Sequence, residues 1–159
     1  MDQFASDMIK KVWAQRSIPV LVRQGKGFPV YVKVPDPQDN PMWWYRIGAW
    51  LKPTVNSRDP QWIRKARGFM VPKGWFNDLT AKLLGQYGKL WIIQPYREQE
   101  VCAPACKNAV GHECNCSCMG QYHGTGGPDA GWFVVNEAFE TRWGEAQMAC
   151  RLMERTAKV

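Results

Sequence analysis

The sequence predicts an α+β fold: a small, mostly antiparallel sheet with two or three helices and a metal-stapled Cys-rich loop module. Three observations lead to this prediction. Short β-branched runs recur around glycine and proline connectors, separate stretches place apolar residues at helical spacing, and five of the six cysteines fall within seventeen residues. We expect a single domain over residues 1–159, with residues 100–126 as the metal-binding module.

The first half of the chain alternates between periodic segments and connectors. Apolar residues at helical spacing predict a short amphipathic helix over 3–16. The runs 18–23 and 28–34 are rich in valine and flank a glycine-bearing connector, which predicts a β-hairpin. Three prolines make 35–43 a loop, and 44–51 is predicted to return as a strand.

The middle of the chain leads directly to the cysteines. Residues 62–71 are predicted as a strand, and 75–85 as a helix with one leucine-rich face. Either Gly85 or Gly88 can end that helix. The apolar run 90–96 predicts a strand that delivers the backbone to the Cys-rich segment.

The last third of the chain contains an ambiguous tail. Residues 124–131 predict a glycine-rich turn, and 132–135 a strand. Five apolar residues from 139 to 153 have helical spacing, whereas positions 148, 150 and 152 alternate as in a strand. We predict a helix, although Gly144 would lie inside it.

Composition and charge bound the class of protein. The chain is 45% apolar and 22% charged, and most of its nine tryptophans are expected in the core. The net charge of +7 favours a polyanionic partner, either nucleic acid or an acidic protein surface. No apolar run approaches the roughly 20 residues that cross a bilayer. Because the amino terminus also lacks a signal-peptide pattern, a cytoplasmic location with reduced thiols is expected.

The Cys-rich segment predicts a zinc site, because thiolates and imidazoles suit a tetrahedral zinc ion. The candidate ligands are Cys102, Cys106, Cys114, Cys116, Cys118 and His123. The preferred quartet is Cys102, Cys106, Cys116 and His123, and His112 is expected to face solvent. A single zinc ion is the first interpretation, two zinc ions that share thiolates the second, and an iron–sulfur cluster the third. The alternative to all three is a group of free thiols with no metal. Cys150 stands apart and is expected to be a buried, inert thiol.

Four sequence words carry a resemblance that spans most of the chain. They are PVLVRQGKGFP, VPKGWFNDL, IIQPYR and CNCSCMGQYHG. They resemble a set of small uncharacterised bacterial proteins often associated with phages and other mobile elements, which share this cysteine cluster. The resemblance implies a mobile-element origin, and it carries over no activity and no catalytic residues.

The residues do not favour an enzyme. A catalytic zinc keeps one position open, whereas thiolate-rich ligand sets are typical of closed structural sites. The zinc-deaminase pattern fails because His112 and Glu113 are adjacent and no Cys-x-x-Cys exists. A zinc-dependent nuclease is an alternative, with His123 as its general base. No phosphate-cradling Walker motif is present.

The densest basic stretch predicts a nucleic-acid-binding surface. It comprises Arg58, Trp62, Arg64, Lys65, Arg67 and Lys73. Arginine and lysine side chains can bind the phosphates of a nucleic acid. The aromatic rings between them have two interpretations: they stack on unpaired bases, or they are buried in the core. Lys26, Lys33 and Arg46 extend the patch if the hairpin packs alongside.

We therefore expect a zinc-stapled basic binding protein of a mobile element that engages nucleic acid or a nucleoprotein complex. The alternative partner is a host defence protein, with the chain acting as an anti-CRISPR or anti-restriction inhibitor by protein–protein contact.

Overall fold

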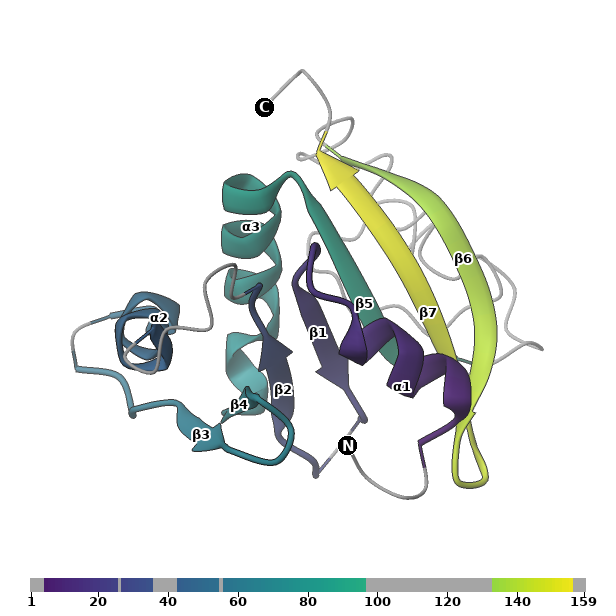
Figure 1. Cartoon of the computed structure of the whole chain (residues 1–159), viewed down its shortest axis with the longest axis horizontal. Coiled ribbons are helices and arrows are strands. Elements are labelled where there is room, and N and C mark those ends of the chain that lie inside the picture. The colour runs from purple at the N-terminus through teal and green to yellow at the C-terminus, as the bar shows by residue number, and fades with distance from the viewer. Residues whose placement is uncertain (1–4, 26, 36–42, 55, 97–132, 156–159) are drawn as a thin grey trace.

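A computed structural model describes residues 5–25, 27–35, 43–54, 56–96 and 133–155 of the chain (Figure 1). The elements follow one another in this order: α1 (Asp7–Ala14), β1 (Val20–Arg23), β2 (Val30–Lys33), α2 (Trp43–Leu51), β3 (Gln61–Ile63), β4 (Gly68–Val71), the short 3₁₀ helix η1 (Lys73–Trp75), α3 (Phe76–Tyr87), β5 (Lys89–Pro95), β6 (Phe133–Trp143) and β7 (Ala146–Arg155). The described residues thus form three α-helices and seven strands, which confirms the α+β class.

The described strands form one sheet in the order β3-β4-β2-β1-β5-β7-β6. Only β1 and β5 pair in parallel, and the other five pairs are antiparallel. The sheet is therefore mostly antiparallel, as predicted. No helix among the described residues is long and apolar enough to cross a membrane.

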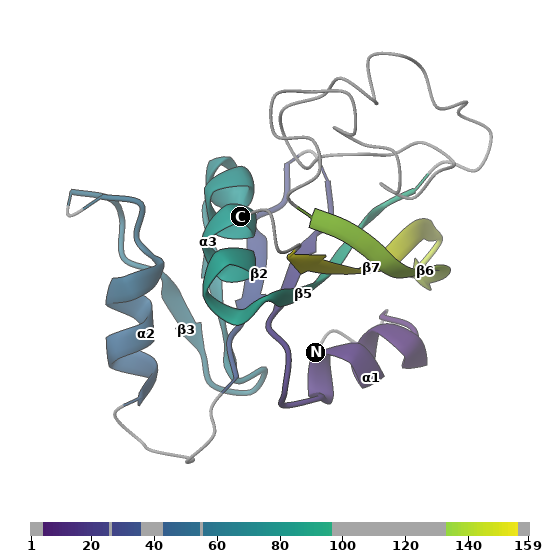
Figure 2. The same cartoon turned by 90° about the horizontal axis from the view of Figure 1, so that it is seen from above.

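Each face of the sheet packs against a helix, because successive side chains of a strand point to opposite faces. Leu21 and Ile92 belong to the core cluster that includes α3. Val22 and Ile93, their neighbours along the same strands, belong to the cluster that includes α1. Figure 2 shows α1 and α3 on opposite sides of the sheet, with α2 beside β3 at the sheet edge. We call the two layers the α1-face core and the α3-face core.

The start of the first helix is capped and tied to the sheet. Ser6 caps α1 by accepting a hydrogen bond from the Ile9 backbone N–H at 3.2 Å. The Ser6 N–H in turn donates to the Arg142 carbonyl oxygen at 3.0 Å, which ties the helix start to β6. The predicted helix over 3–16 is therefore confirmed, with its described bounds at Asp7 and Ala14.

The strand predicted over 44–51 is wrong, since these residues form the helix α2. Trp43, Ile47 and Trp50 recur at helical spacing and pack against the α3-face core. The Lys82 ammonium donates to the Trp50 carbonyl oxygen and lies 4.7 Å from the centre of the Trp50 ring, which joins α2 to α3. Tertiary packing has thus overridden the strand preference of tryptophan and isoleucine.

Several central predictions are confirmed with adjusted bounds. The runs 18–23 and 28–34 form the β1–β2 hairpin, and 90–96 corresponds to β5. The single strand predicted over 62–71 is two strands, β3 and β4, joined by a turn. Gly88 ends α3 with φ of 78°, a left-handed conformation that glycine adopts without a Cβ penalty.

The helix predicted for the tail is wrong. Residues 133–155 form the long antiparallel pair β6 and β7, and β7 also pairs with β5. The turn between β6 and β7 has two residues, and Gly144 adopts φ of 61° there. Gly144 therefore lies in the turn that joins the two strands and not inside a helix. The alternation at positions 148, 150 and 152 predicted the strand correctly.

Candidate nucleic-acid interface

The predicted metal ligands lie outside the described residues. Cys102, Cys106, Cys114, Cys116, Cys118 and His123 all belong to the segment 97–132, which connects β5 to β6 along the chain. In the described part of the chain, no three His, Cys, Asp or Glu side chains are grouped so that they could hold a metal ion. The zinc site therefore stays a prediction.

Three of the predicted basic residues lie together in the turn between β3 and β4. Arg64, Lys65 and Arg67 are all exposed there. The Arg67 N–H donates to the Arg64 carbonyl oxygen at 3.3 Å, and Arg67 adopts φ of 54°. A non-glycine residue in this left-handed region is uncommon, and the short turn between two paired strands requires it. The turn thus presents three cations at one end of the hairpin.

The other two predicted cations lie at the opposite end of the same hairpin. Gln61 pairs with Met70 and Ile63 pairs with Gly68, so β3 begins where β4 ends. Arg58 precedes β3 and Lys73 follows β4, and both side chains are exposed. The structure therefore divides the predicted basic stretch into two groups separated by the length of a strand.

The aromatic residues of this stretch pack mainly into the core. Phe69 is only 2% exposed, and Trp62 meets it edge-on with ring centres 5.0 Å apart. Trp62 and Trp75 are partly buried against the α3-face core. The second reading of these rings, as core residues, is therefore the better supported one.

Two further cations join the turn from other elements. Lys33 is the last residue of β2, which pairs with β4, and Arg16 follows the end of α1 by two residues. Partial burial lowers the pKa of Lys33, and the neighbouring charges of Arg16 and Arg67 lower that pKa further. We call Arg16, Lys33, Arg64, Lys65 and Arg67 the basic end. Lys33 was anticipated as an extension of the patch, whereas Arg16 was missed.

The basic end is built around Trp13, the last buried residue of α1. Its indole N–H donates to the Ala66 carbonyl oxygen at 2.8 Å, and its own carbonyl oxygen accepts from the Lys33 ammonium. A Cβ on Gly68 would lie 2.6 Å from Trp13 Cζ2 and 2.8 Å from the Val32 carbonyl oxygen. Only glycine therefore lets β4 approach α1 and β2 so closely.

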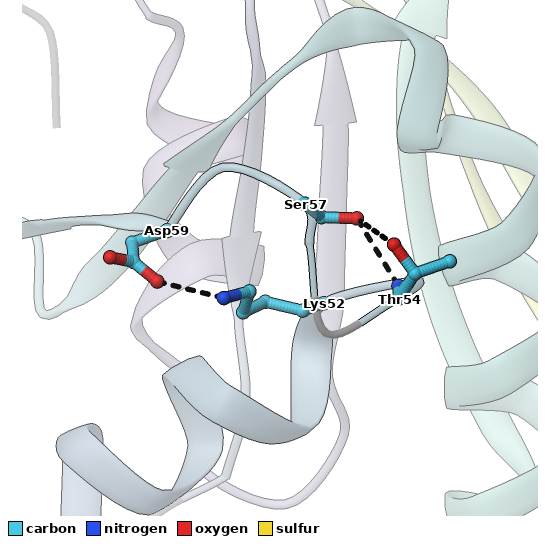
Figure 3. A network of polar contacts seen from close by, with 4 residues as sticks. All are labelled: Lys52, Thr54, Ser57 and Asp59. Carbon is cyan, nitrogen blue, oxygen red and sulfur yellow. Dashed lines mark hydrogen bonds and ion pairs between the residues drawn. The ribbon is translucent and has the colours of Figure 1, made fainter.

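Acidic residues are scarce in the described part of the N-terminal half. Residues 5–77 contain twelve described Lys and Arg against two Asp and Glu, whereas 78–155 contain five against five. One of the two acids, Asp59, pairs with Lys52 at 3.0 Å, and a Thr54–Ser57 contact shapes the same loop (Figure 3). The excess of Lys and Arg over Asp and Glu in the first half of the sequence is the signal that points to the basic end.

Two neighbouring residues of β7, Cys150 and Arg151, are fully buried. Cys150 is fully buried, and burial raises its pKa from the ordinary 9.0 to about 12, which fits the inert thiol expected from the sequence. Arg151 is also fully buried, and its guanidinium donates to the Gln94 side-chain oxygen at 3.5 Å. A buried arginine within an apolar run has no local sequence signal, so Arg151 was missed.

No family model, curated protein or solved structure matches the chain. The resemblance to mobile-element proteins therefore stays a prediction.

Proposed function

We propose that the chain binds nucleic acid, free or within a nucleoprotein complex, and that the basic end is the contact surface. The observation that carries this proposal is that Trp13 joins three segments that carry five cations. Its indole N–H bonds the β3–β4 turn at Ala66, its carbonyl oxygen bonds Lys33 at the end of β2, and Arg16 follows it just after α1. Protein cations that neutralise phosphates release condensed counterions, and this release supplies most of the affinity of sequence-independent binding.

The charge distribution supports the same proposal. A cationic surface raises the local concentration of a polyanion when few acidic groups oppose it. The described residues of 5–77 supply ten more cations than anions, whereas those of 78–155 balance. The attraction is therefore directed to one half of the molecule.

The test compares two double variants that lose the same charge. Arg64→Gln with Arg67→Asn removes two cations of the basic end, and asparagine tolerates the left-handed backbone at position 67. Lys89→Gln with Arg142→Gln removes two exposed cations from β5 and β6. We expect the first pair to lower affinity for DNA or RNA by roughly tenfold or more, and to reduce the slope of log affinity against log salt by about two.

The second pair is expected to change affinity less than about threefold, because it alters net charge without removing phosphate contacts. Fluorescence anisotropy across a salt titration measures both quantities. Equal losses in the two pairs would show that only net charge matters and would overturn the assignment to the basic end. An unmodified protein that binds no nucleic acid overturns the proposed function itself.

We also propose that the segment 100–126 binds zinc through a quartet drawn from Cys102, Cys106, Cys116 and His123, with Cys114 and Cys118 as the next candidates. The support is the residue types and their spacing. Elemental analysis of purified protein is expected to find about one zinc per chain, which is lost in Cys102→Ser or Cys116→Ser. Cys150→Ala is the matched control and should keep its zinc, because Cys150 is buried in β7. Metal content that survives both serine substitutions contradicts the ligand choice, and iron in place of zinc contradicts the metal.

A further inference from the structure

We propose that the basic end docks on the phosphate backbone of duplex nucleic acid, with Arg16, Lys33 and Arg67 as its central phosphate site, and that it does not read unpaired bases. This inference rests on the proposed function and specifies the form of the partner.

The central site is held in place by the fold. The Lys33 ammonium is fixed by its hydrogen bond to the Trp13 carbonyl oxygen and lies 5.9 Å from the centre of the Trp13 ring. The turn that carries Arg67 is fixed to the same tryptophan through the Ala66 carbonyl oxygen. Because the Lys33 ammonium and the backbone of the turn are positioned before binding, less conformational entropy is lost when a phosphate arrives.

Lys33 lies in a positive electrostatic environment. Partial burial lowers the pKa of Lys33, and the charges of Arg16 and Arg67 lower that pKa further. A phosphate group near Lys33 would favour its charged form, and arginine presents planar paired donors that match phosphate oxygens. The cluster is therefore suited to an anion with several charged oxygens.

The aromatic rings around the basic end are engaged in the core. Trp13 is 5% exposed, Phe69 is 2% exposed, and Trp62 and Tyr31 are partly buried against the two cores. Proteins that bind single strands stack bases on open aromatic faces, which supply a large share of the affinity. The described rings at the basic end do not offer such faces, so phosphate contacts dominate.

Duplex is the form that phosphate contacts favour. Its charge density is higher than that of a single strand, and each neutralised phosphate releases more counterion, with a slope of about 0.9 against about 0.7. Among described aromatic residues, the large exposed rings are Phe28 in the β1–β2 connection, Tyr45 on α2 and Tyr87 at the end of α3. Tyr45 offers the most open ring and serves as the probe for stacking.

The experiment measures the affinity of the full chain for a 20-base-pair duplex and for either strand alone, at the same salt concentration. We expect the duplex to bind at least about threefold more tightly than the single strand, and a duplex of changed base composition to bind within about twofold. Tyr45→Ala is expected to leave both affinities unchanged. If the single strand binds more tightly than the duplex, or if Tyr45→Ala loses single-strand binding, this inference is overturned and the proposed function stands.

A matched pair of single variants tests the central site. Arg16→Gln removes an exposed cation of the site, and Arg58→Gln removes an exposed cation at the other end of the β3–β4 hairpin. We expect Arg16→Gln to weaken duplex binding by about fivefold or more and to lower the salt slope by about one, with Arg58→Gln within about twofold of the unmodified protein. Equal effects overturn the central site. Binding to neither duplex nor single strand overturns both proposals.

Discussion

The strands that precede residue 72 in the chain, β3, β4, β2 and β1, occupy one half of the sheet, and β5, β7 and β6 occupy the other (Figure 1). Both halves are built in the same way, with apolar side chains directed to the α1-face core and the α3-face core. The surfaces differ, because nearly all of the excess positive charge of the described residues belongs to the first half.

The contrast shows that charge and fold are set independently here. The two halves meet where β1 and β5 pair in parallel over three residues, and both core layers continue across this junction. The apolar pattern therefore unites the halves, whereas among the described residues cations outnumber anions only in the first. Most cations of the first half are exposed and lie outside both cores, so its excess charge is a property of the surface.

The largest expected effect comes from separating α1 from β4 in the basic half. Gly68→Ala places a methyl group against Trp13 and the Val32 carbonyl oxygen, so the backbone must shift. We expect a loss of about 2–3 kcal/mol in the free energy of unfolding, measured by chemical denaturation. Gly74→Ala is the control, because a Cβ there meets nothing within 4 Å, and it should be neutral or slightly stabilising. Similar losses in the two variants would show that the close approach at Gly68 is not what holds α1 against β4.

The next effect belongs to the other half and depends on pH. The Cys150 thiol keeps its proton to a pKa of about 12 in the folded protein, whereas the unfolded chain releases it near 9.0. Between these values the folded state binds more protons, so the free energy of unfolding falls as pH rises. We expect the unmodified protein to lose about 1.4 kcal/mol relative to Cys150→Ala between pH 7 and pH 10. Parallel stability curves for the two proteins would contradict the buried thiol.

The smallest effect has the opposite sign and lies in the basic half. Partial burial, with Arg16 and Arg67 nearby, lowers the pKa of Lys33 below 10.5. Below the lowered pKa, the folded protein bears the cost of a charged, half-buried lysine. As pH rises through that value toward 10.5, the folded state releases its proton first, so its stability increases relative to Lys33→Met. Denaturation of both proteins from pH 7 to 10 measures this change. A free energy of unfolding of the unmodified protein that stays constant or falls relative to Lys33→Met as pH rises would contradict the lowered pKa.

Much of the fold follows from local pattern. The helices α1 and α3, the β1–β2 hairpin and β5 were predicted from the spacing of apolar residues and the placement of glycine. These segments are long enough, or bounded sharply enough, for one period to dominate. The basic stretch 58–73 was likewise visible, although its division into two ends was not, because the division depends on how β3 pairs with β4.

The sequence by itself determined the composition of the core, the excess of cations in the first half and the clustering of cysteines in 97–132. Only the tertiary structure decided that 43–51 is a helix and that the tail is a pair of strands. Both segments fit two periods, and packing against α3 and pairing with β5 settle which one is realised. The tertiary structure also decided the assembly of the basic end. Arg16, Lys33 and Arg67 are far apart along the chain, and they meet because Trp13, Ala66 and Gly68 bring three segments together.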